Sequence, residues 1–253
     1  MKYLGGKYFI GKELSEVMKS LVKKEDVNGY LEPFCGALSV LTYMNEEFDC
    51  TASDYHPDLI EMWKSVQNNT FIPPKKITEK DYNKIKKLPS PNALKAFIGF
   101  GCSFGGRFFG AYADKYANGK NEDYLKEEIN SINRKKLKIK GVKFKCKNYK
   151  EYNPNKMLVY CDPPYENTKF PIKYRRDTKY YDEFDNNEFW NIMREWSKNN
   201  IVFISEITAP KDFIEIWNKN SHRSVAQSSK TRYKSKSDTF KTEKLFIHNS
   251  LLE

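Results

Sequence analysis

The stretch YLEPFCGALSVLTYMNEEFDCTASD, residues 30–54, decides the fold class. It opens with a short apolar segment typical of a buried strand and passes through a small-residue turn at Gly36-Ala37. Helical spacing follows through residues 40–44, and a second strand ends in an acid, Asp54. Strand, tight turn, helix and acid-terminated strand together form the opening of a nucleotide-binding α/β unit.

The segments around this unit extend the same pattern. Residues 7–22 and 187–198 have the apolar spacing of helices. Further strands are expected where apolar residues cluster, at residues 142–146, 157–161, 201–205, 223–226 and 245–248. The link at residues 228–244 is rich in Ser, Lys and Thr, so we expect a loop there. The whole pattern predicts an α/β fold with a Rossmann-like sheet and helices on both faces.

The composition changes between Pro57 and Lys140. This stretch is rich in Lys, Tyr and Asn, and it is interrupted by Pro73, Pro74, Pro89 and Pro91. We interpret residues 57–140 as an inserted, mostly helical domain. The main domain is then formed by residues 1–56 and 141–253 together.

The charge of the chain indicates the kind of partner. Its 253 residues have a formal net charge of +11 and a sequence pI near 9.2. Such an excess of positive charge favours an anionic partner, and a nucleic acid is the natural candidate. An AT-rich genome would also enrich Lys, Asn, Ile and Tyr whatever the function, so charge alone leaves both explanations open.

Membranes, disulfides and metals are not indicated. No apolar run is long enough to span a bilayer, and Lys7, Lys12 and Glu13 interrupt the stretch where a signal peptide would lie. We therefore expect an intracellular, cytoplasmic protein without a membrane partner. The 5 cysteines form no CxxC pair and the 3 histidines are scattered, so we expect buried thiols in a reducing compartment and no metal centre.

The strongest chemical signal is Asp162-Pro163-Pro164-Tyr165, which directly follows the apolar residues 157–161. Two consecutive prolines remove two backbone donors and fix φ, so the carbonyls here are held rigidly. Asp162 and the Pro163 carbonyl can accept hydrogen bonds from the amino group of a planar base, and Tyr165 can stack on its ring. A plain strand-ending turn is the alternative, but open α/β sheets bind ligands at strand ends. These four residues are therefore the candidate catalytic group.

Three further signals suit a nucleotide-like ligand, although each alone could be an ordinary turn or loop. In EPFCGA, residues 32–37, a glycine at a strand end lets backbone amides approach a ligand. Asp54 follows at roughly the twenty-residue distance at which an acid meets ribose hydroxyls. In YLGGK, residues 3–7, the glycines either turn into a helix or let Lys7 reach a carboxylate-bearing ligand. The spacing excludes a Walker A loop.

A block of glycines and aromatic residues, FIGFGCSFGGRFFGAY at residues 97–112, lies in the centre of the insert. Arg107 could contact guanine with two hydrogen bonds or bind a phosphate. Phe104, Phe108 or Phe109 could stack on a base or fill the gap left by a flipped base. The alternative is that these rings are the small core of the insert. Lys230 and Arg232, in the polar link, are further candidates for phosphate contacts.

In this order, the motifs resemble those of the Dam-type DNA adenine methyltransferases, the α-class arrangement. The matching stretches are YLGGK at residues 3–7, EPFCG at 32–36, Asp54, DPPY at 162–165, Ile204-Ser205 and a closing strand at 241–248. They span nearly the whole chain. Several groups of amino-methyltransferases share the DPPY tetrapeptide, whereas a Gly-Gly-Lys start followed by an insert is more specific to this family.

This resemblance implies a site for S-adenosylmethionine, formed by Tyr3, Lys7, Pro33, Phe34, Gly36, Asp54 and Asp162. It also implies that residues 57–140 are the target-recognition domain of a site-specific, adenine-specific enzyme of the restriction–modification type. Such an enzyme methylates the 6-amino group of an adenine flipped out of double-stranded DNA. Leu38 departs from the family pattern, because relatives usually carry a second glycine there. The turn is therefore expected to curl differently or to lie farther from the cofactor.

Two alternatives stay open. The same fold could methylate the amino group of cytosine, or RNA, because the DPPY tetrapeptide alone does not decide between them. The chain could also be a DNA-binding relative without activity, although the intact residues 162–165 argue against this. The resemblance requires no metal, and it leaves the oligomeric state open, with a monomer favoured.

Overall fold

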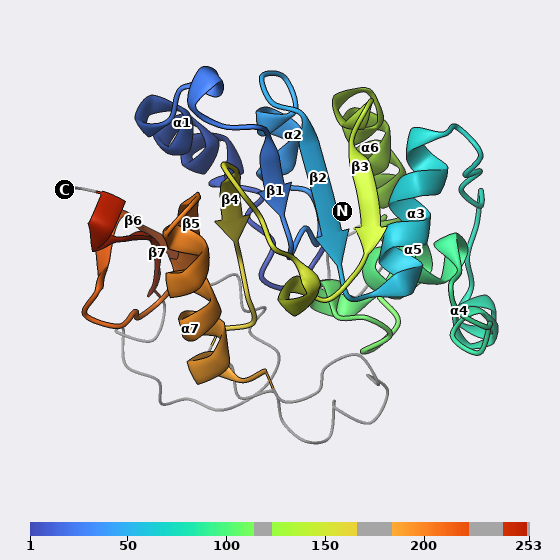
Figure 1. The fold of residues 1–253 in the computed structure, drawn as a ribbon. Coiled ribbons are helices and arrows are strands. Elements are labelled where there is room, and N and C mark those ends of the chain that lie inside the picture. The colour runs from blue at the N-terminus through green and yellow to red at the C-terminus, as the bar shows by residue number, and fades with distance from the viewer. Residues whose placement is uncertain (114–122, 166–183, 223–239, 252–253) are drawn as a thin grey trace, which may run out of the picture.

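The computed structural model describes residues 1–113, 123–165, 184–222 and 240–251. At its centre lies a seven-stranded sheet with the order β3-β2-β1-β4-β5-β7-β6 (Figure 1). The strands are β1 (Tyr30–Glu32), β2 (Cys50–Asp54), β3 (Lys143–Cys146), β4 (Leu158–Cys161), β5 (Ile201–Glu206), β6 (Phe213–His222) and β7 (Phe240–His248). The sheet and its surrounding helices confirm the α/β class that the sequence predicts.

The strand order reverses beside β1. The chain moves outward from β1 to β2 and β3, and β4 then pairs with the opposite side of β1. These strands and β5 are parallel, whereas β7 runs antiparallel to both of its neighbours. Open α/β sheets bind ligands where the order reverses, outside the carboxyl ends of the strands. The topology therefore predicts a ligand site at the ends of β1 and β4.

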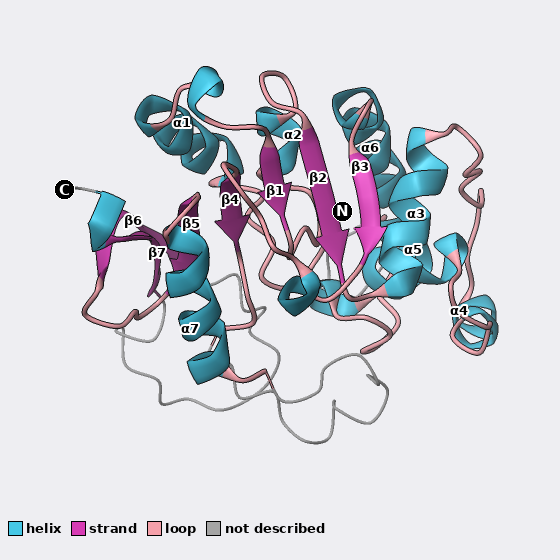
Figure 2. Ribbon diagram, in the orientation of Figure 1, coloured by secondary structure: helices cyan, strands magenta, loops and turns pink. Residues whose placement is uncertain are grey.

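Apolar layers cover both faces of the sheet. Along β4, Leu158 and Tyr160 belong to one buried cluster, and Val159 and Cys161 belong to the other, because side chains alternate along a strand. The first cluster includes residues of α1 (Gly11–Leu21) and the short α2 (Leu41–Met44). The second is formed with α7 (Asn186–Ser197), which lies in front of the sheet in Figure 2. The helices on both faces confirm the predicted arrangement.

The described part of segment 57–140 is mostly helical, as predicted. Its helices are α3 (Pro57–Gln67), α4 (Glu79–Ile85), α5 (Ala93–Gly101) and α6 (Tyr124–Lys136). Proline at the first position and a hydrogen bond to the His56 side chain define the start of α3. Its buried Leu59 and Trp63 join the same apolar cluster as Leu158 of the sheet. The helices of this segment therefore share a core with the strands.

The C-terminal strands differ from the prediction. The strand expected at residues 223–226 lies outside the described residues, whereas β6 occupies Phe213–His222. Residues 240–244, expected in a loop, form the first half of β7. Polar side chains such as Asn218 and Lys219 hide the strand character of β6, because this strand lies at the edge of the sheet.

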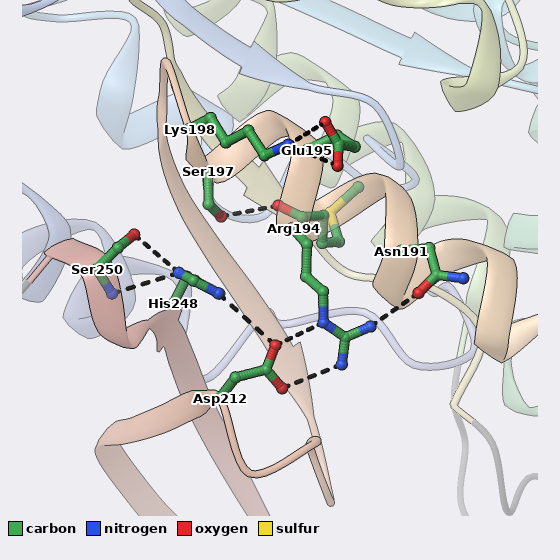
Figure 3. A network of polar contacts seen from close by, with 9 residues as sticks. Asn191, Arg194, Glu195, Ser197, Lys198, Asp212, His248 and Ser250 are labelled. Atoms are coloured by element: carbon green, nitrogen blue, oxygen red, sulfur yellow. Dashed lines mark hydrogen bonds and ion pairs between the residues drawn. The ribbon is translucent and has the colours of Figure 1, made fainter.

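Hydrogen bonds and ion pairs among Arg194, Asp212 and His248 connect α7 to the β6–β7 pair (Figure 3). The Arg194 guanidinium donates two hydrogen bonds to Asp212, at 2.5 and 3.0 Å from the carboxylate oxygens. His248 Nε2 lies 3.6 Å from the same carboxylate. The Arg194 hydrogen bonds hold the pKa of Asp212 below its ordinary value. This network fixes the helix to both antiparallel strands.

Four of the five cysteines are buried, as the sequence predicts, and one is not. All five are free, and only Cys146, on the edge strand β3, is exposed. Among the described residues, no helix combines the length and apolar character that crossing a bilayer requires.

Candidate active site

The turn after β1 has an unusual backbone. Gly36 has a φ of 42°, and Leu38 has a φ of 58° although it carries a side chain. The left-handed region favours glycine, so Leu38 has a backbone conformation that a glycine at this position would adopt with less strain. The Leu38 side chain is fully buried, and the Leu38 amide donates to the Cys35 carbonyl across 2.7 Å. The substitution thus leaves a tight turn in place.

Asp54 closes this turn from β2. One carboxylate oxygen accepts a hydrogen bond from the Gly36 amide at 3.1 Å, and the other accepts from the His56 amide at 3.0 Å. Burial raises the pKa of Asp54 to about 6, although these backbone donors act in the opposite direction. The acid expected to meet a ribose therefore lies against the glycine turn.

Asp162 lies at the end of β4 and is paired with the N-terminal segment. The Lys7 ammonium donates to Asp162 Oδ1 across 2.6 Å and to the Gly5 carbonyl across 3.2 Å. The Lys7 side chain is only 4% exposed, against 19% for Asp162. The carboxylate that Lys7 reaches thus belongs to the candidate catalytic group. This ion pair joins two of the stretches that the sequence singles out.

Glu243 of β7 completes this group, although no motif in the sequence indicates it. The Tyr165 hydroxyl donates to Glu243 Oε2 across 2.7 Å, and Lys7 Nζ lies 3.7 Å from the same oxygen. Lys7 also lies over the Tyr165 ring, 4.8 Å from its centroid. Burial and the neighbouring Asp162 and Glu243 carboxylates raise the pKa of Tyr165 well above its ordinary value. One ammonium therefore lies among two carboxylates and a buried ring.

A further acid, Glu32, directly precedes the turn. Glu32, the last residue of β1, is buried, and its carboxylate accepts a hydrogen bond from the Tyr30 hydroxyl across 2.8 Å. Burial, together with the charge of Asp162, raises the pKa of Glu32 to about 8. The ends of β1 and β4 thus bring carboxyl groups into one region, as the strand reversal predicts.

Phe34, in the turn after β1, packs against the aromatic residues of the second apolar cluster. Its ring is half-buried. The ring centroid lies 5.0 Å from that of Tyr149, 6.1 Å from that of Phe184 and 6.0 Å from that of Phe189. Neighbouring Pro33 is buried. Tyr149 follows the end of β3, and its position beside Phe34 could be found only from the sheet order. The adjacent strand ends thus supply flat apolar surfaces.

Tyr3 lies between the turn and the glycine–aromatic block. Its ring packs on Phe100 with a centroid distance of 4.9 Å, and a methyl group on Gly36 would lie 3.0 Å from it. The Leu4 amide donates to the Gly106 carbonyl across 3.2 Å. A methyl group on Gly106 would lie 2.6 Å from the Tyr3 amide nitrogen, and its φ is 67°. The block therefore supports the N-terminal segment directly.

The residues proposed to contact DNA fall into different environments. Phe108 is half-buried in a ring cluster, 4.4 Å from His56 and 4.8 Å from Phe100. Phe104 is 36% exposed, and Arg107 is also exposed. Lys230 and Arg232 lie outside the described residues. The block thus provides both core rings and side chains accessible to a ligand.

The structure brings most of the candidate residues to the carboxyl ends of β1, β2 and β4. Lys7 contacts both Asp162 and Tyr165. Of the two prolines between these residues, Pro163 is buried and Pro164 is half-buried. Tyr3 and Asp54 meet at Gly36. Within the described part of the chain, no cluster of His, Cys, Asp and Glu has the composition to hold a metal ion.

Two comparisons with known proteins give matches for this chain. The family model of the D12 class N6 adenine-specific DNA methyltransferases matches residues 3–98, which include Lys7, the turn after β1 and Asp54. The Type II methyltransferase M.MjaIII of Methanocaldococcus jannaschii is 26% identical over 217 residues, which cover 71% of this chain and 73% of that protein. These two similarities confirm the resemblance to DNA adenine methyltransferases that the motifs indicated: residues 3–98 of this chain are similar to the D12 class N6 adenine-specific DNA methyltransferases.

Proposed function

We propose that this chain transfers a methyl group from S-adenosylmethionine to the 6-amino group of adenine in double-stranded DNA. The observation that carries the proposal is the Lys7–Asp162 ion pair at the strand reversal, beside the turn that Asp54 closes. The relationship to adenine-specific DNA methyltransferases supports the reaction class. Asp162, Pro163, Pro164 and Tyr165 are the catalytic group in this proposal.

The acidic groups of the site fit S-adenosylmethionine. The cofactor is cationic at its sulfonium and amino groups, and the carboxyl groups of Asp162 and Glu243 lie together at this end of the sheet. Asp54 can accept from ribose hydroxyls. The proposed cofactor contacts are Tyr3, Lys7, Pro33, Phe34, Gly36, Asp54 and Asp162. When bound, the cofactor supplies a strongly electrophilic methyl group.

Asp162 and the Pro163 carbonyl would each accept a hydrogen bond from one of the two N–H groups of the adenine amino group. The amino lone pair is delocalised into the ring, and these hydrogen bonds localise it on nitrogen. Lys7 orients the carboxylate, since it holds Asp162 Oδ1 at 2.6 Å. Alignment and electrostatics then explain the rate, because preorganised donors and acceptors need no rearrangement during reaction.

The target base must leave the duplex to reach Asp162, which costs a few kcal/mol. Residues 57–140 are the proposed target-recognition domain, with Arg107, Phe104 and Phe108 as its candidate contacts. Lys230 and Arg232 are proposed phosphate contacts. The net charge of +11 is consistent with this partner. A restriction–modification role inside the cell agrees with the family and with the Type II methyltransferase relative.

Sequencing that detects modified bases tests this proposal in cells. DNA from cells that express the chain should carry N6-methyladenine at one recurring short sequence, and DNA from cells that express Asp162→Ala should not. N4-methylcytosine at a recurring sequence would instead assign the cytosine reaction. Modification confined to RNA would contradict the proposed substrate.

A further inference from the structure

We infer that Trp63 and Lys135 are positioning residues that hold the turn after β1 in its cofactor-binding form. The two side chains come from α3 and α6, within the proposed target-recognition segment. This inference rests on the proposed function only in treating residues 35–38 as part of the cofactor site. It assigns a role to two buried groups that the proposed chemistry does not use.

The turn needs support from outside. Two of its residues, Gly36 and Leu38, have φ values of 42° and 58°. For a leucine this conformation is strained, and strained backbone persists only where the surrounding structure over-determines it. The Gly36 amide donates to Asp54, and the Leu38 amide donates to Cys35. These bonds secure amides of the turn, whereas the carbonyls of Gly36 and Ala37 need donors from elsewhere in the chain.

Trp63 secures the first carbonyl. Its indole N–H donates to the Gly36 carbonyl across 3.0 Å, and its side chain is fully buried. A peptide unit is planar, so fixing the Gly36 carbonyl also fixes the direction of the Ala37 N–H in the same plane. Trp63 thereby sets the orientation of one backbone donor of the turn.

Lys135 secures the next carbonyl. Its ammonium donates to the Ala37 carbonyl, and only 8% of the residue is exposed. The same planarity links the Ala37 carbonyl to the Leu38 N–H. Lys135 also lies over the Trp63 ring, 5.6 Å from its centroid. Burial lowers the pKa of Lys135 to about 8, although the neighbouring Glu128 and Glu32 carboxyl groups act to raise it.

Two consecutive carbonyls of the turn thus accept hydrogen bonds from two helices of segment 57–140. Neither helix belongs to the strand–turn–helix unit in which the turn lies. A buried lysine is costly unless it is paired, so its ammonium is strongly held where its partners lie. Any displacement of α3 or α6 would move a carbonyl of the turn. The contacts therefore link the proposed DNA-recognition segment to the cofactor site.

Matched variants separate positioning from folding. Lys135→Met keeps a buried stem and removes the donor, and Lys136→Met makes the same substitution at the next position of α6. Trp63→Phe removes the indole N–H, and Trp196→Phe makes the same change in α7, on the other apolar cluster. Amide exchange of residues 35–38 reports the turn without cofactor. Calorimetry with S-adenosylmethionine reports its affinity, and steady-state kinetics separate KM from kcat.

Lys135→Met and Trp63→Phe should each speed exchange in the turn and raise the Kd and KM for S-adenosylmethionine about tenfold, which is about 1.4 kcal/mol. The kcat, the KM for DNA and both control variants should stay near wild type. Wild-type affinity and exchange in both test variants would overturn the inference and leave the proposed function intact. If the wild-type chain bound no S-adenosylmethionine, the proposed function would fail. Unchanged amide exchange in Lys135→Met and Trp63→Phe would still reject the positioning role of the two residues. Should Lys135→Met not fold, Trp63→Phe decides alone.

Discussion

Lys7 Nζ lies 2.6 Å from Asp162 Oδ1 although the two residues are 155 positions apart in the sequence. The pair joins the N-terminal segment to the end of β4, next to the point where the strand order reverses. The two side chains belong to separate motifs, and their contact explains why a glycine-rich N-terminal stretch accompanies the DPPY tetrapeptide. The glycines bring a backbone carbonyl, that of Gly5, and the ammonium to the same place.

Glu243 should be required for turnover more than for cofactor binding. In Glu243→Ala the Tyr165 hydroxyl loses its 2.7 Å acceptor, and Lys7 loses one of its two carboxylates. We expect kcat to fall about tenfold or more, with a loss of about 1–3 kcal/mol in the free energy of unfolding for the uncompensated hydroxyl. Tyr165→Phe removes the hydroxyl and should restore the lost stability in the double variant. Near-normal kcat in Glu243→Ala would remove this residue from the site.

Asp54 should make cofactor affinity depend on pH. Its pKa is raised to about 6 by burial, so the ionised acceptor is lost as the pH falls through that value. Affinity for S-adenosylmethionine should therefore rise between about pH 5 and pH 7, and Asp54→Asn should flatten this dependence. Asp54→Ala should weaken binding by about 1.5–3 kcal/mol. The nearby thiols of Cys35 and Cys146 have pKa values above their ordinary range, so they do not titrate in this window.

The same raised pKa has the opposite effect on folding. A carboxyl group with a raised pKa in the folded state contributes most to stability when it is protonated, below its ordinary pKa of 3.8. That contribution is lost as the pH rises toward about 6.

The binding prediction for Asp54 is checked by calorimetry. An affinity for S-adenosylmethionine that is unchanged in Asp54→Ala, or equally pH-dependent in Asp54→Asn, would remove Asp54 from the cofactor site.

The sequence predicts those parts of the site that lie within short motifs. Asp54, Asp162 and the turn at Gly36 each follow an apolar strand, so the amino-acid pattern alone places them at the edge of the sheet. Glu243 could not be found in this way. The resemblance includes it in a closing strand, but its place beside Lys7 follows only from the pairing of β7 with β5 and β6.

Lys135 is hidden for a different reason. Arg134, Lys135 and Lys136 follow one another, and only the rotation of α6 decides which of the three is buried. Leu38 shows a third limit. A leucine in place of the expected glycine predicts a turn of different shape. In the structure Leu38 nevertheless has a left-handed backbone, and its side chain is buried. Helix rotation and tertiary packing are not encoded in a local motif.

Arg107→Ala should lower methylation of the preferred DNA sequence while cofactor affinity and Tm stay near wild type. The side chain is exposed, and the block around it packs on Tyr3 through Gly106. A loss of about 1–3 kcal/mol at one base position would indicate base reading, and a uniform loss would indicate a phosphate contact. Phe108→Ala is the comparison, because its packed ring predicts a loss of stability instead. Unaltered activity of Arg107→Ala on every DNA would assign recognition elsewhere.

The Arg194–Asp212 pair should stabilise the fold modestly and in a pH-dependent way. Both side chains are about one third exposed, at 35% and 31%, so we expect a loss of only about 0.5–1 kcal/mol in Asp212→Asn at pH 7. The pKa of Asp212 is lowered, so its contribution is present above the ordinary aspartate pKa and is lost as the pH falls through the lowered value.

Urea denaturation at pH 7 and at low pH checks this expectation. Glu195→Gln is the control, because its pair with Lys198 lies on the same helix and is far more exposed, at 68% and 64%. It should leave the free energy of unfolding nearly unchanged. An Asp212→Asn effect that persisted undiminished in acid would mean that packing, and not the ion pair, is responsible.

The most direct test of the central claim is transfer of a tritium-labelled methyl group from S-adenosylmethionine to unmethylated genomic DNA by the purified chain, followed by separation of the nucleosides. We predict label in N6-methyldeoxyadenosine, and a fall of at least about a hundredfold for Asp162→Ala, whose Tm should stay close to wild type. Label in N4-methyldeoxycytidine, or near-normal turnover by Asp162→Ala, would contradict the proposed reaction.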